Sequence, residues 1–321
     1  MTRLSLLRRA LVALPLLAVL ATGCATEDVG RSSYRVPSVA SAGGRNVGVF
    51  LGGQTDIATH EAWVGSRVSY VGGYVPKTTW SAFDRASFRQ WTGKGRTLVV
   101  GVPMLMTQQG GSLGAGANGA YDSHFRSLAN RLVAEGHPRA LLRLGWEFNG
   151  DWYPWRADRD PQAFASYWRR IVTTMRSVPG GAGLRFDWNP GHGPGFVPEA
   201  AYPGDAYVDV VSFDVYDRTW SNRFVDPAAR WRDYLARPYG LNWLRDFARA
   251  HGKPMGFPEW GVTRNHVGGV RHDNPTFIRG MADFIRTNNV EYHNYFNVRA
   301  HDGDFRLLNF PESARAYQQA F

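Results

Sequence analysis

Eight short apolar runs, rich in β-branched and aromatic residues, constrain the fold of this chain more than any other feature. They alternate with longer amphipathic segments, which is the pattern of repeated β-α units. The predicted strands cover residues 46–51, 67–74, 97–105, 140–147, 184–189, 208–216, 254–259 and 291–297, and predicted helices between them include 122–135, 161–176, 241–250 and 275–287. Eight such units predict an α/β fold, a single (β/α)₈ TIM barrel.

Polar side chains stand where several of these strands end. The fourth strand ends in Glu147, the fifth in Asn189, the sixth in Asp214 and Tyr216, and the seventh in Glu259. The C-terminal ends of barrel strands meet at one mouth, where the chemistry of such folds takes place. Two carboxylic acids are therefore expected at one site, and glycoside hydrolysis usually needs two.

An aromatic run follows Glu147 and includes Trp152, Tyr153 and Trp155. Such rings stack on the apolar faces of pyranoses, and a carboxyl group beside them can deliver a proton to a glycosidic oxygen. Packing in the core is the alternative for these rings, and at least one of them is expected to be structural. Trp152 and Trp155 are the preferred candidates for sugar contact.

Residues two apart on a strand share a face, which predicts that Arg143, Gly145 and Glu147 face the barrel together. By the same rule Asp214 and Tyr216 share one face of the sixth strand. A buried arginine is costly without a carboxylate partner, so Arg143 indicates an acidic centre. Its charge can keep a neighbouring carboxylate ionised.

The segment 143–155 resembles the acid/base motif of glycoside hydrolase family 26, the β-mannanase family of clan A. The residues that carry the resemblance are Arg143, Glu147, Asn149, Gly150, Trp152 and Trp155 in this segment, Trp188, Asn189, Asp214 and Tyr216 at the fifth and sixth strand ends, and Lys253, Pro254, Glu259, Trp260 and Gly261 around the seventh. The resemblance implies a retaining β-glycosidase with Glu147 as general acid/base and Glu259 as nucleophile.

These roles require opposite protonation states. We expect the pKa of Glu147 to be raised by its aromatic surroundings and by the charge of Glu259, and Glu259 to stay ionised with help from Arg143 and the hydroxyl of Tyr216. The sequence departs from the family at Trp146, where its mannanases usually have histidine. The implied substrate is therefore a β-linked polysaccharide, either β-mannan-like or a related β-glycan.

Further residues near the strand ends are candidates for substrate contact. The predicted substrate-binding set is Trp146, Asn149, Trp152, Trp155, Trp188, Asn189, His192, Asp214 and Trp260. Asn189 and Asp214 could instead hydrogen-bond within the barrel mouth. His192, His293 and His301 do not stand at a metal-ligand spacing, and neither a metal nor another cofactor is predicted.

The first 23 residues have the features of an export signal. Arg3, Arg8 and Arg9 precede an apolar run too short to span a bilayer, and the run is followed by Cys24, the single cysteine of the chain. This resembles a bacterial lipoprotein signal, with a lone core cysteine as the alternative. The sequence thus predicts a signal peptide over 1–23, a flexible tether over 24–44 and a catalytic barrel over 45–321. The mature protein is expected to be an exported monomer. It is expected to be lipid-anchored through Cys24 at the outer face of the bacterial cytoplasmic membrane or in the cell envelope.

The formal net charge of +10 comes without a run of lysines and arginines and without a nucleic-acid motif. A solvated, arginine-rich surface is therefore favoured over a nucleic-acid partner. The leading functional hypothesis is an endo-acting hydrolase of a polysaccharide. A carbohydrate-binding lipoprotein without turnover and a transglycosylase remain alternatives.

Overall fold

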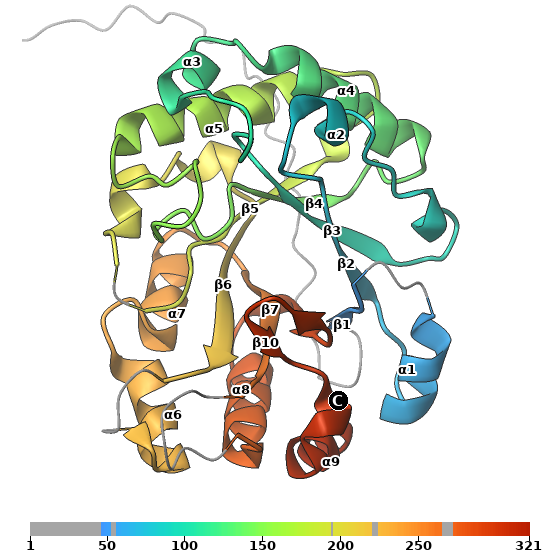
Figure 1. Ribbon diagram of the computed structural model, residues 1–321, viewed down its shortest axis with the longest axis vertical. Coiled ribbons are helices and arrows are strands. Elements are labelled where there is room, and N and C mark those ends of the chain that lie inside the picture. Colours follow the sequence, from blue (N-terminus) through green and yellow to red (C-terminus); the bar gives the residue numbers. More distant parts are fainter. Residues whose placement is uncertain (1–45, 53–55, 194, 220–223, 265–271) are drawn as a thin grey trace, which may run out of the picture. The chain divides into compact units, whose positions relative to one another are not determined.

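The computed structural model describes residues 46–52, 56–193, 195–219, 224–264 and 272–321. Eight parallel strands form a closed barrel in the order β1 to β8 (Figure 1). They are β1 Val47–Phe50, β2 Tyr70–Tyr74, β3 Thr97–Val102, β4 Leu141–Leu144, β5 Arg185–Trp188, β6 Val210–Asp217, β7 Met255–Val262 and β8 Val290–Phe296. The predicted (β/α)₈ fold is confirmed. Residues 1–45, which include Cys24, the predicted signal and the tether, lie outside the described residues.

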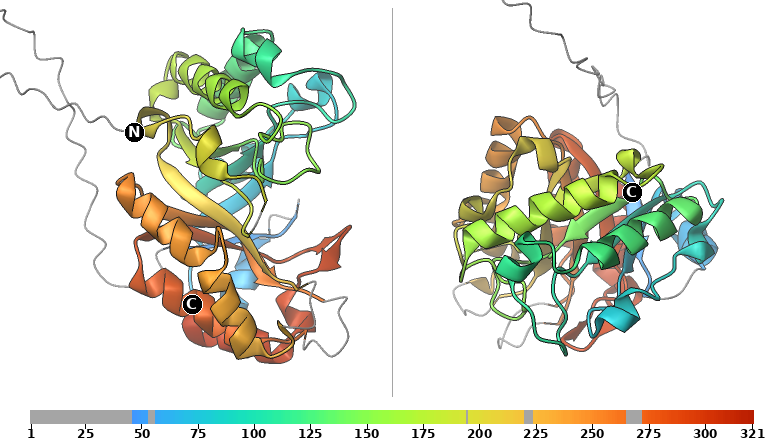
Figure 2. Two further views of the ribbon diagram at one scale, coloured as in Figure 1. Left: turned by 90° about the vertical axis from the view of Figure 1, so that its left-hand side faces the viewer. Right: turned by 90° about the horizontal axis from the view of Figure 1, so that it is seen from above.

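Helices lie outside the strands (Figure 2). They are α1 Ile57–Val64, α2 Trp80–Phe83, α3 Leu113–Ala117, α4 Asp122–Ala134, α5 Pro161–Arg176, α6 Pro227–Ala236, α7 Leu241–Ala250, α8 Pro275–Thr287 and α9 Pro311–Ala320. A hairpin of β9 Arg299–Ala300 and β10 Gly303–Asp304 follows β8, and short 3₁₀ turns include Arg89–Trp91, Gly181–Gly183, Pro198–Ala201, Asp205–Tyr207 and Leu307–Asn309. None of the helices described is long and apolar enough to cross a bilayer.

Local sequence signals set the starts of the long helices. A side-chain oxygen of Asp160 accepts a hydrogen bond from the backbone N–H of Ala163 (2.9 Å), and proline occupies the first helical position of α5. Asp226 caps α6 and Asn274 caps α8 in the same way, each followed by proline. Proline fits there because its missing N–H would have no partner within the helix.

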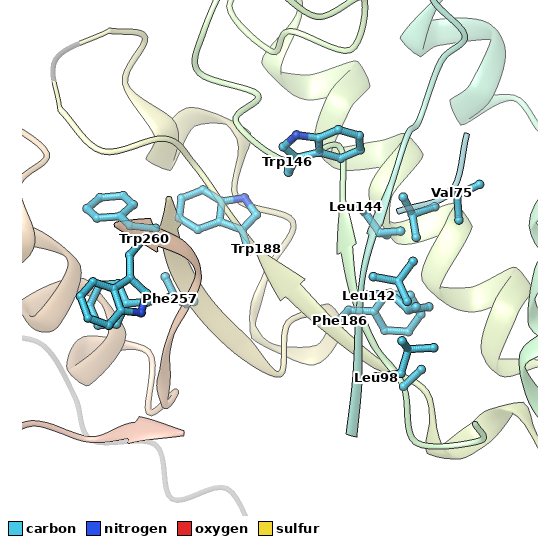
Figure 3. Close-up of a cluster of buried hydrophobic side chains, with 14 of the residues drawn as sticks. Val75, Leu98, Leu142, Leu144, Trp146, Phe186, Trp188, Phe257 and Trp260 are labelled. Carbon is cyan, nitrogen blue, oxygen red and sulfur yellow. The ribbon is translucent and has the colours of Figure 1, made fainter. Parts of the chain in front are cut away.

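The main hydrophobic core lies between the strands and the helices. Outward-facing side chains such as Leu142, Phe186 and Phe257 are fully buried in it (Figure 3). A smaller cluster of Val99, Leu141, Val210 and Tyr292 fills the barrel interior, with Tyr70 packed against it. The interior is thus a packed core, as in other barrels of this type, and the strand ends above it are left to carry a site.

Strand β4 ends earlier than the sequence predicts. It stops at Leu144, and Gly145 (φ +52°) and Glu147 (φ +53°) both adopt left-handed backbone conformations in a turn. The prediction that Arg143, Gly145 and Glu147 share one strand face is therefore wrong, because the alternation stops before Gly145. The backbone N–H of Glu147 donates to the carbonyl of Asn189 (2.8 Å), which ties this turn to the end of β5.

A β-bulge in β7 sets the direction of Glu259. On β6 the step from Ser212 to Asp214 is two residues. Their partners on β7, Gly256 and Glu259, are three residues apart, so β7 contains one extra residue. In a regular strand Glu259 would share the outward face of Phe257, which packs on Phe284 of α8. The extra residue on β7 turns the carboxylate to the inside, and Pro258 stands in the bulged segment, where a missing N–H is tolerated.

Candidate active site

Glu259 of β7 lies in a site built to hold a carboxylate. Its Oε1 accepts a hydrogen bond from Nη2 of Arg143 (2.8 Å) and one from the hydroxyl of Tyr74, and its Oε2 accepts one from the hydroxyl of Tyr216 (2.7 Å). Burial opposes ionisation, but the charge of Arg143 and these hydrogen bonds outweigh it and lower the pKa of Glu259. The expected support from Arg143 and Tyr216 is present.

Arg143 of β4 lies beneath Glu259 and joins three strand ends. Its Nη2 donates to Asp214 Oδ2 (2.5 Å) as well as to Glu259, and its Nε donates to Asn189 Oδ1 (2.8 Å). Its side chain is 3% exposed and that of Asp214 is fully buried. Asn189 is fully buried as well. Asn189 and Asp214, both predicted to bind substrate, therefore hold Arg143 in place, in line with the alternative of hydrogen bonding within the mouth.

Glu147, just beyond β4, has a different environment. Its carboxylate accepts one hydrogen bond, from the indole Nε1 of Trp152 to Oε2 (3.1 Å). Burial and then the charge of Glu259 raise its pKa to about 7, against the smaller opposing effects of Trp152 and Arg143. The two glutamates thus differ in the predicted direction: Glu259 is held as a carboxylate, and Glu147 can carry a proton near neutral pH.

The aromatic residues around Glu147 divide into an exposed ring and a buried group. Trp152 is 60% exposed, and a Cβ on Gly150 would lie 2.3 Å from its ring, so only glycine lets the indole fold back toward Glu147. Trp146 is buried and donates to the hydroxyl of Tyr153 (3.2 Å). Trp155 is fully buried and donates to the Trp146 carbonyl (2.9 Å), so its predicted sugar contact is wrong and it is a packing residue.

Trp188 and Trp260 also do not belong to the site. Both are fully buried in the outer core (Figure 3). Trp188 stacks on Phe247 of α7, and Trp260 packs against Tyr317 of α9 while its indole N–H donates to His293 Nδ1 (3.2 Å). Each directly adjoins an inward-facing residue of its strand, and neighbouring strand residues point to opposite faces. The prediction of substrate contact is wrong for both.

Asn149 and His192 hold the loop that follows β5. The amide of Asn149 donates to the carbonyl of Gly191 (2.9 Å) and accepts from its N–H (2.6 Å). Nε2 of His192 lies 3.0 Å from the carbonyl of Tyr234, and burial lowers the pKa of this imidazole to about 3. His192 is therefore a neutral ring that binds backbone, and the amide of Asn149 already donates and accepts a hydrogen bond. Both side chains position the loop next to Glu147 and do not offer these groups to a ligand.

Sequence reasoning missed two side chains of the site, Tyr74 and Lys77. Tyr74 is the last residue of β2, so the strand-end rule applied to Glu147 and Glu259 would also have selected it. Lys77 follows three residues later, with its Nζ 4.6 Å from the ring centre of Tyr153 and 5.7 Å from that of Trp146. No sequence pattern distinguishes it from a surface lysine.

A metal centre is not part of this site as far as the structure describes it. No group of three or more histidine, cysteine, aspartate or glutamate side chains among those residues is arranged to hold an ion. His293 contacts Trp260 and Phe321 on the outer side of β8, and His301 is exposed. The two carboxyl groups of this site can perform proton transfer and nucleophilic attack.

A (β/α)₈ barrel with one carboxyl group of raised pKa after β4 and a second of lowered pKa on β7 has the arrangement of the glycoside-hydrolase barrels. The comparison with known proteins identifies the family. The model of glycosyl hydrolase family 26 matches residues 64–252, and the chain belongs to this family. The match includes Glu147 and ends before β7, so the assignment of Glu259 depends on the geometry described above.

Relatives of known sequence share segments of the chain. Mannan endo-1,4-beta-mannosidase of Bifidobacterium adolescentis is 29% identical over 125 residues, which are 38% of this chain and 12% of that protein. Endoglucanase H of Acetivibrio thermocellus is 27% identical over 225 residues, which are 63% of this chain and 22% of that protein. The chain therefore spans less than a quarter of the length of either relative.

Solved structures share the fold. A modular endo-beta-1,4-mannanase from Cellulomonas fimi superposes with a TM-score of 0.58 at 19% identity, over 85% of this chain and 70% of that one. A family 26 beta-mannanase from Bacteroides ovatus gives a TM-score of 0.60 at 16% identity, over 86% and 88%. At these identities the likeness supports the barrel fold and no finer assignment.

Proposed function

We propose that this protein is a retaining glycoside hydrolase that cleaves internal bonds of a β-linked polysaccharide, with Glu147 as general acid/base and Glu259 as nucleophile. The observation that carries the proposal is the contrast between the two carboxyl groups. Glu259 accepts three hydrogen bonds, one of them from a buried guanidinium, whereas Glu147 accepts one from an indole. Such a split in pKa separates the proton donor from the ionised carboxylate of a glycosidase, and membership of family 26 supports a nucleophilic role for that carboxylate.

In the first step, one carboxylate oxygen of Glu259 attacks the anomeric carbon of the sugar. The bond between that carbon and the glycosidic oxygen breaks, and Glu147 gives its proton to the leaving oxygen. The product is an ester between Glu259 and the sugar. Arg143 and Tyr216 keep Glu259 ionised before attack, and burial keeps Glu147 protonated near neutral pH.

In the second step, Glu147 is a carboxylate and takes a proton from water. The water oxygen bonds to the anomeric carbon, and the ester bond to Glu259 breaks. Glu259 returns as a carboxylate and Glu147 as an acid, so both groups are ready for the next substrate. Two successive inversions at the same carbon leave its configuration unchanged.

The family and its named members support the proposed substrate class. The named relatives are a mannan endo-1,4-beta-mannosidase and an endoglucanase. A β-mannan or a related β-glycan, cut within the chain, is therefore the proposed substrate. Trp146 stands where mannanases of the family usually have histidine, and its buried ring packs beside Tyr74, a hydrogen-bond partner of Glu259. Glycans other than mannan belong in the first assays for this reason.

We also propose export and lipid anchoring through Cys24. The support is the sequence of the first 24 residues. Expression of the full chain in a bacterium with an alkyne-labelled fatty acid tests it. The wild type should take up the label and fractionate with membranes, and Cys24→Ser should do neither. Labelling that is equal in both variants would contradict the anchor.

Chemical rescue tests the two carboxyl roles separately. Glu147→Gly suits the left-handed backbone at that position, and with azide and an aryl β-glycoside it should give a β-glycosyl azide. Glu259→Ala should give the α-glycosyl azide instead. Both variants should lose on the order of 10² to 10⁴ in kcat on a polysaccharide. Glu312→Gln, at the start of α9, is the matched control and should keep full activity.

The same experiment separates the alternative functions. Turnover that neither glutamate variant reduces would rule out the two-glutamate mechanism, and binding without turnover in the wild type would identify a carbohydrate-binding protein. Transglycosylation uses a sugar hydroxyl in place of water in the second step. Lengthened products at high acceptor concentration would identify it.

A further inference from the structure

Lys77 is a cation of the candidate active site that the proposed mechanism does not use. It lies in the loop after β2, on the side of the barrel where the strands end. The backbone carbonyl of Lys77 accepts hydrogen bonds from the N–H (2.8 Å) and the hydroxyl (3.1 Å) of Thr107, so the loop after β3 fixes its position. Its ammonium group lies over the rings of Tyr153 and Trp146.

The ammonium group is close to the catalytic carboxyl groups but is not bound to them. The charges of Glu147 and Glu259 reach Lys77, but burial has the larger effect and lowers the pKa of this half-buried amine. No carboxylate oxygen of a described residue lies within 4.0 Å of its Nζ. Its one side-chain hydrogen bond within these residues is a long one, to the hydroxyl of Tyr153 (3.5 Å). Two of its three donors thus remain for a ligand.

The two glutamates already have the partners that their roles require. Arg143, Tyr74 and Tyr216 bind Glu259, and Trp152 binds Glu147. A second cation is therefore not needed to hold the nucleophile. A partly desolvated charge is favoured only when an opposite charge or strong acceptors pair with it. A sugar hydroxyl would accept a hydrogen bond from one N–H of Lys77 but would leave the positive charge unpaired. A carboxylate would accept hydrogen bonds and also neutralise the charge.

We propose that Lys77 is a specificity-determining residue that binds a carboxylate on the sugar chain next to the cleaved bond, so that the substrate is an acidic β-glycan containing uronic acid. This inference rests on the proposed hydrolase function. The aromatic pair of Trp146 and Tyr153 holds the ammonium group in place by cation–π contact, and the carboxylate of the substrate completes its coordination.

Matched substrates test the proposal directly. Neutral β-1,4-manno- and gluco-oligosaccharides are compared with the same oligosaccharides whose C6 hydroxyl groups have been oxidised to carboxylates. The wild type should cleave an oxidised form with the higher kcat/KM. Lys77→Met should lower the ratio of kcat/KM on the oxidised form to kcat/KM on the neutral parent about 10- to 100-fold, mainly through KM on the oxidised form. Lys77→Arg should recover part of the loss.

Controls separate this inference from the function on which it rests. Lys94→Met removes an exposed lysine from the loop that precedes β3, at the opposite end of the barrel, and should leave both substrates unaffected. Calorimetry with the Glu147→Gln variant measures binding without turnover. Raised salt should weaken binding of the oxidised oligosaccharide to this variant. It should not weaken binding to the double variant that carries both Glu147→Gln and Lys77→Met.

The outcomes are distinct. Cleavage of neutral glycans alone, or an equal effect of Lys77→Met on both forms, would overturn the role of Lys77 and leave the hydrolase standing. Failure to cleave any glycan, together with salt-sensitive binding of the oxidised form that needs Lys77, would overturn the hydrolase and keep the carboxylate site. Binding of neither form would overturn both.

Discussion

Arg143 and Glu259 are joined through Nη2 of the guanidinium, the same nitrogen that binds Asp214. The distances are 2.8 Å to Glu259 Oε1 and 2.5 Å to Asp214 Oδ2. One buried cation thus sets the ionisation of the proposed nucleophile and ties β4 to β6 and β7. The proposed activity and the stability of the fold should therefore both depend on this side chain.

Replacement of this cation should affect both properties. Arg143→Met leaves two buried carboxylates unpaired and should lower the free energy of unfolding by about 3 to 5 kcal/mol. The pKa of Glu259 should rise, so the acidic limb of the kcat/KM profile should move to higher pH. Urea unfolding and a pH profile measure the two effects. An unchanged acidic limb would show that Arg143 does not control Glu259.

Glu147 should make the fold less stable at neutral pH. Its pKa of about 7 in the folded protein lies above the ordinary value of 4.5. A raised carboxyl pKa contributes stability that is fully present below about pH 4.5 and is lost as pH rises to about 7. Glu147→Gln removes this loss and should be roughly 1 to 3 kcal/mol more stable than the wild type at pH 8. The difference between the two free energies of unfolding, measured in urea, should vanish near pH 4. A difference that is the same at all pH values would contradict the prediction.

The indole N–H of Trp152 should tune the pKa of Glu147, the proposed proton donor. It binds the charged form of Glu147 and so lowers the pKa of that group. Trp152→Phe keeps a ring and removes the donor, so the basic limb of kcat/KM should move to higher pH. The other charged groups whose effect reaches Glu147 include Glu259, Arg143, Asp214, Asp302 and Lys77, and none of them is altered by this change. A basic limb that stays in place would remove Trp152 from this role.

Trp260 should matter for stability and not for substrate binding. It is fully buried between β7 and the helices α8 and α9. Trp260→Phe leaves a cavity and an unpaired His293 nitrogen, and should lower the free energy of unfolding by about 1 to 3 kcal/mol. KM should stay within about twofold of the wild type, since no substrate contact is lost. A large rise in KM without loss of stability would restore the substrate-binding prediction.

The sequence alone predicts the barrel and both glutamates because strand periodicity and strand ends are local signals. The same periodicity points Trp188 and Trp260 away from the barrel mouth, because both adjoin inward-facing residues, whereas the family resemblance includes both tryptophans in its motifs. The turn at Gly145 and the bulge before Glu259 could not be predicted. Both depend on pairing with strands far along the chain, and a one-residue change of register reverses every side chain that follows.

The left-handed backbone of Glu147 makes this position informative when related sequences are compared. A glutamate held at φ +53° gives up free energy that glycine or asparagine would not. Selection keeps such a residue only while the carboxyl group is used. In barrels of this lineage that have stopped cleaving glycans, this position should drift to glycine or asparagine before the surrounding core changes, and its identity would mark where in the lineage turnover was lost.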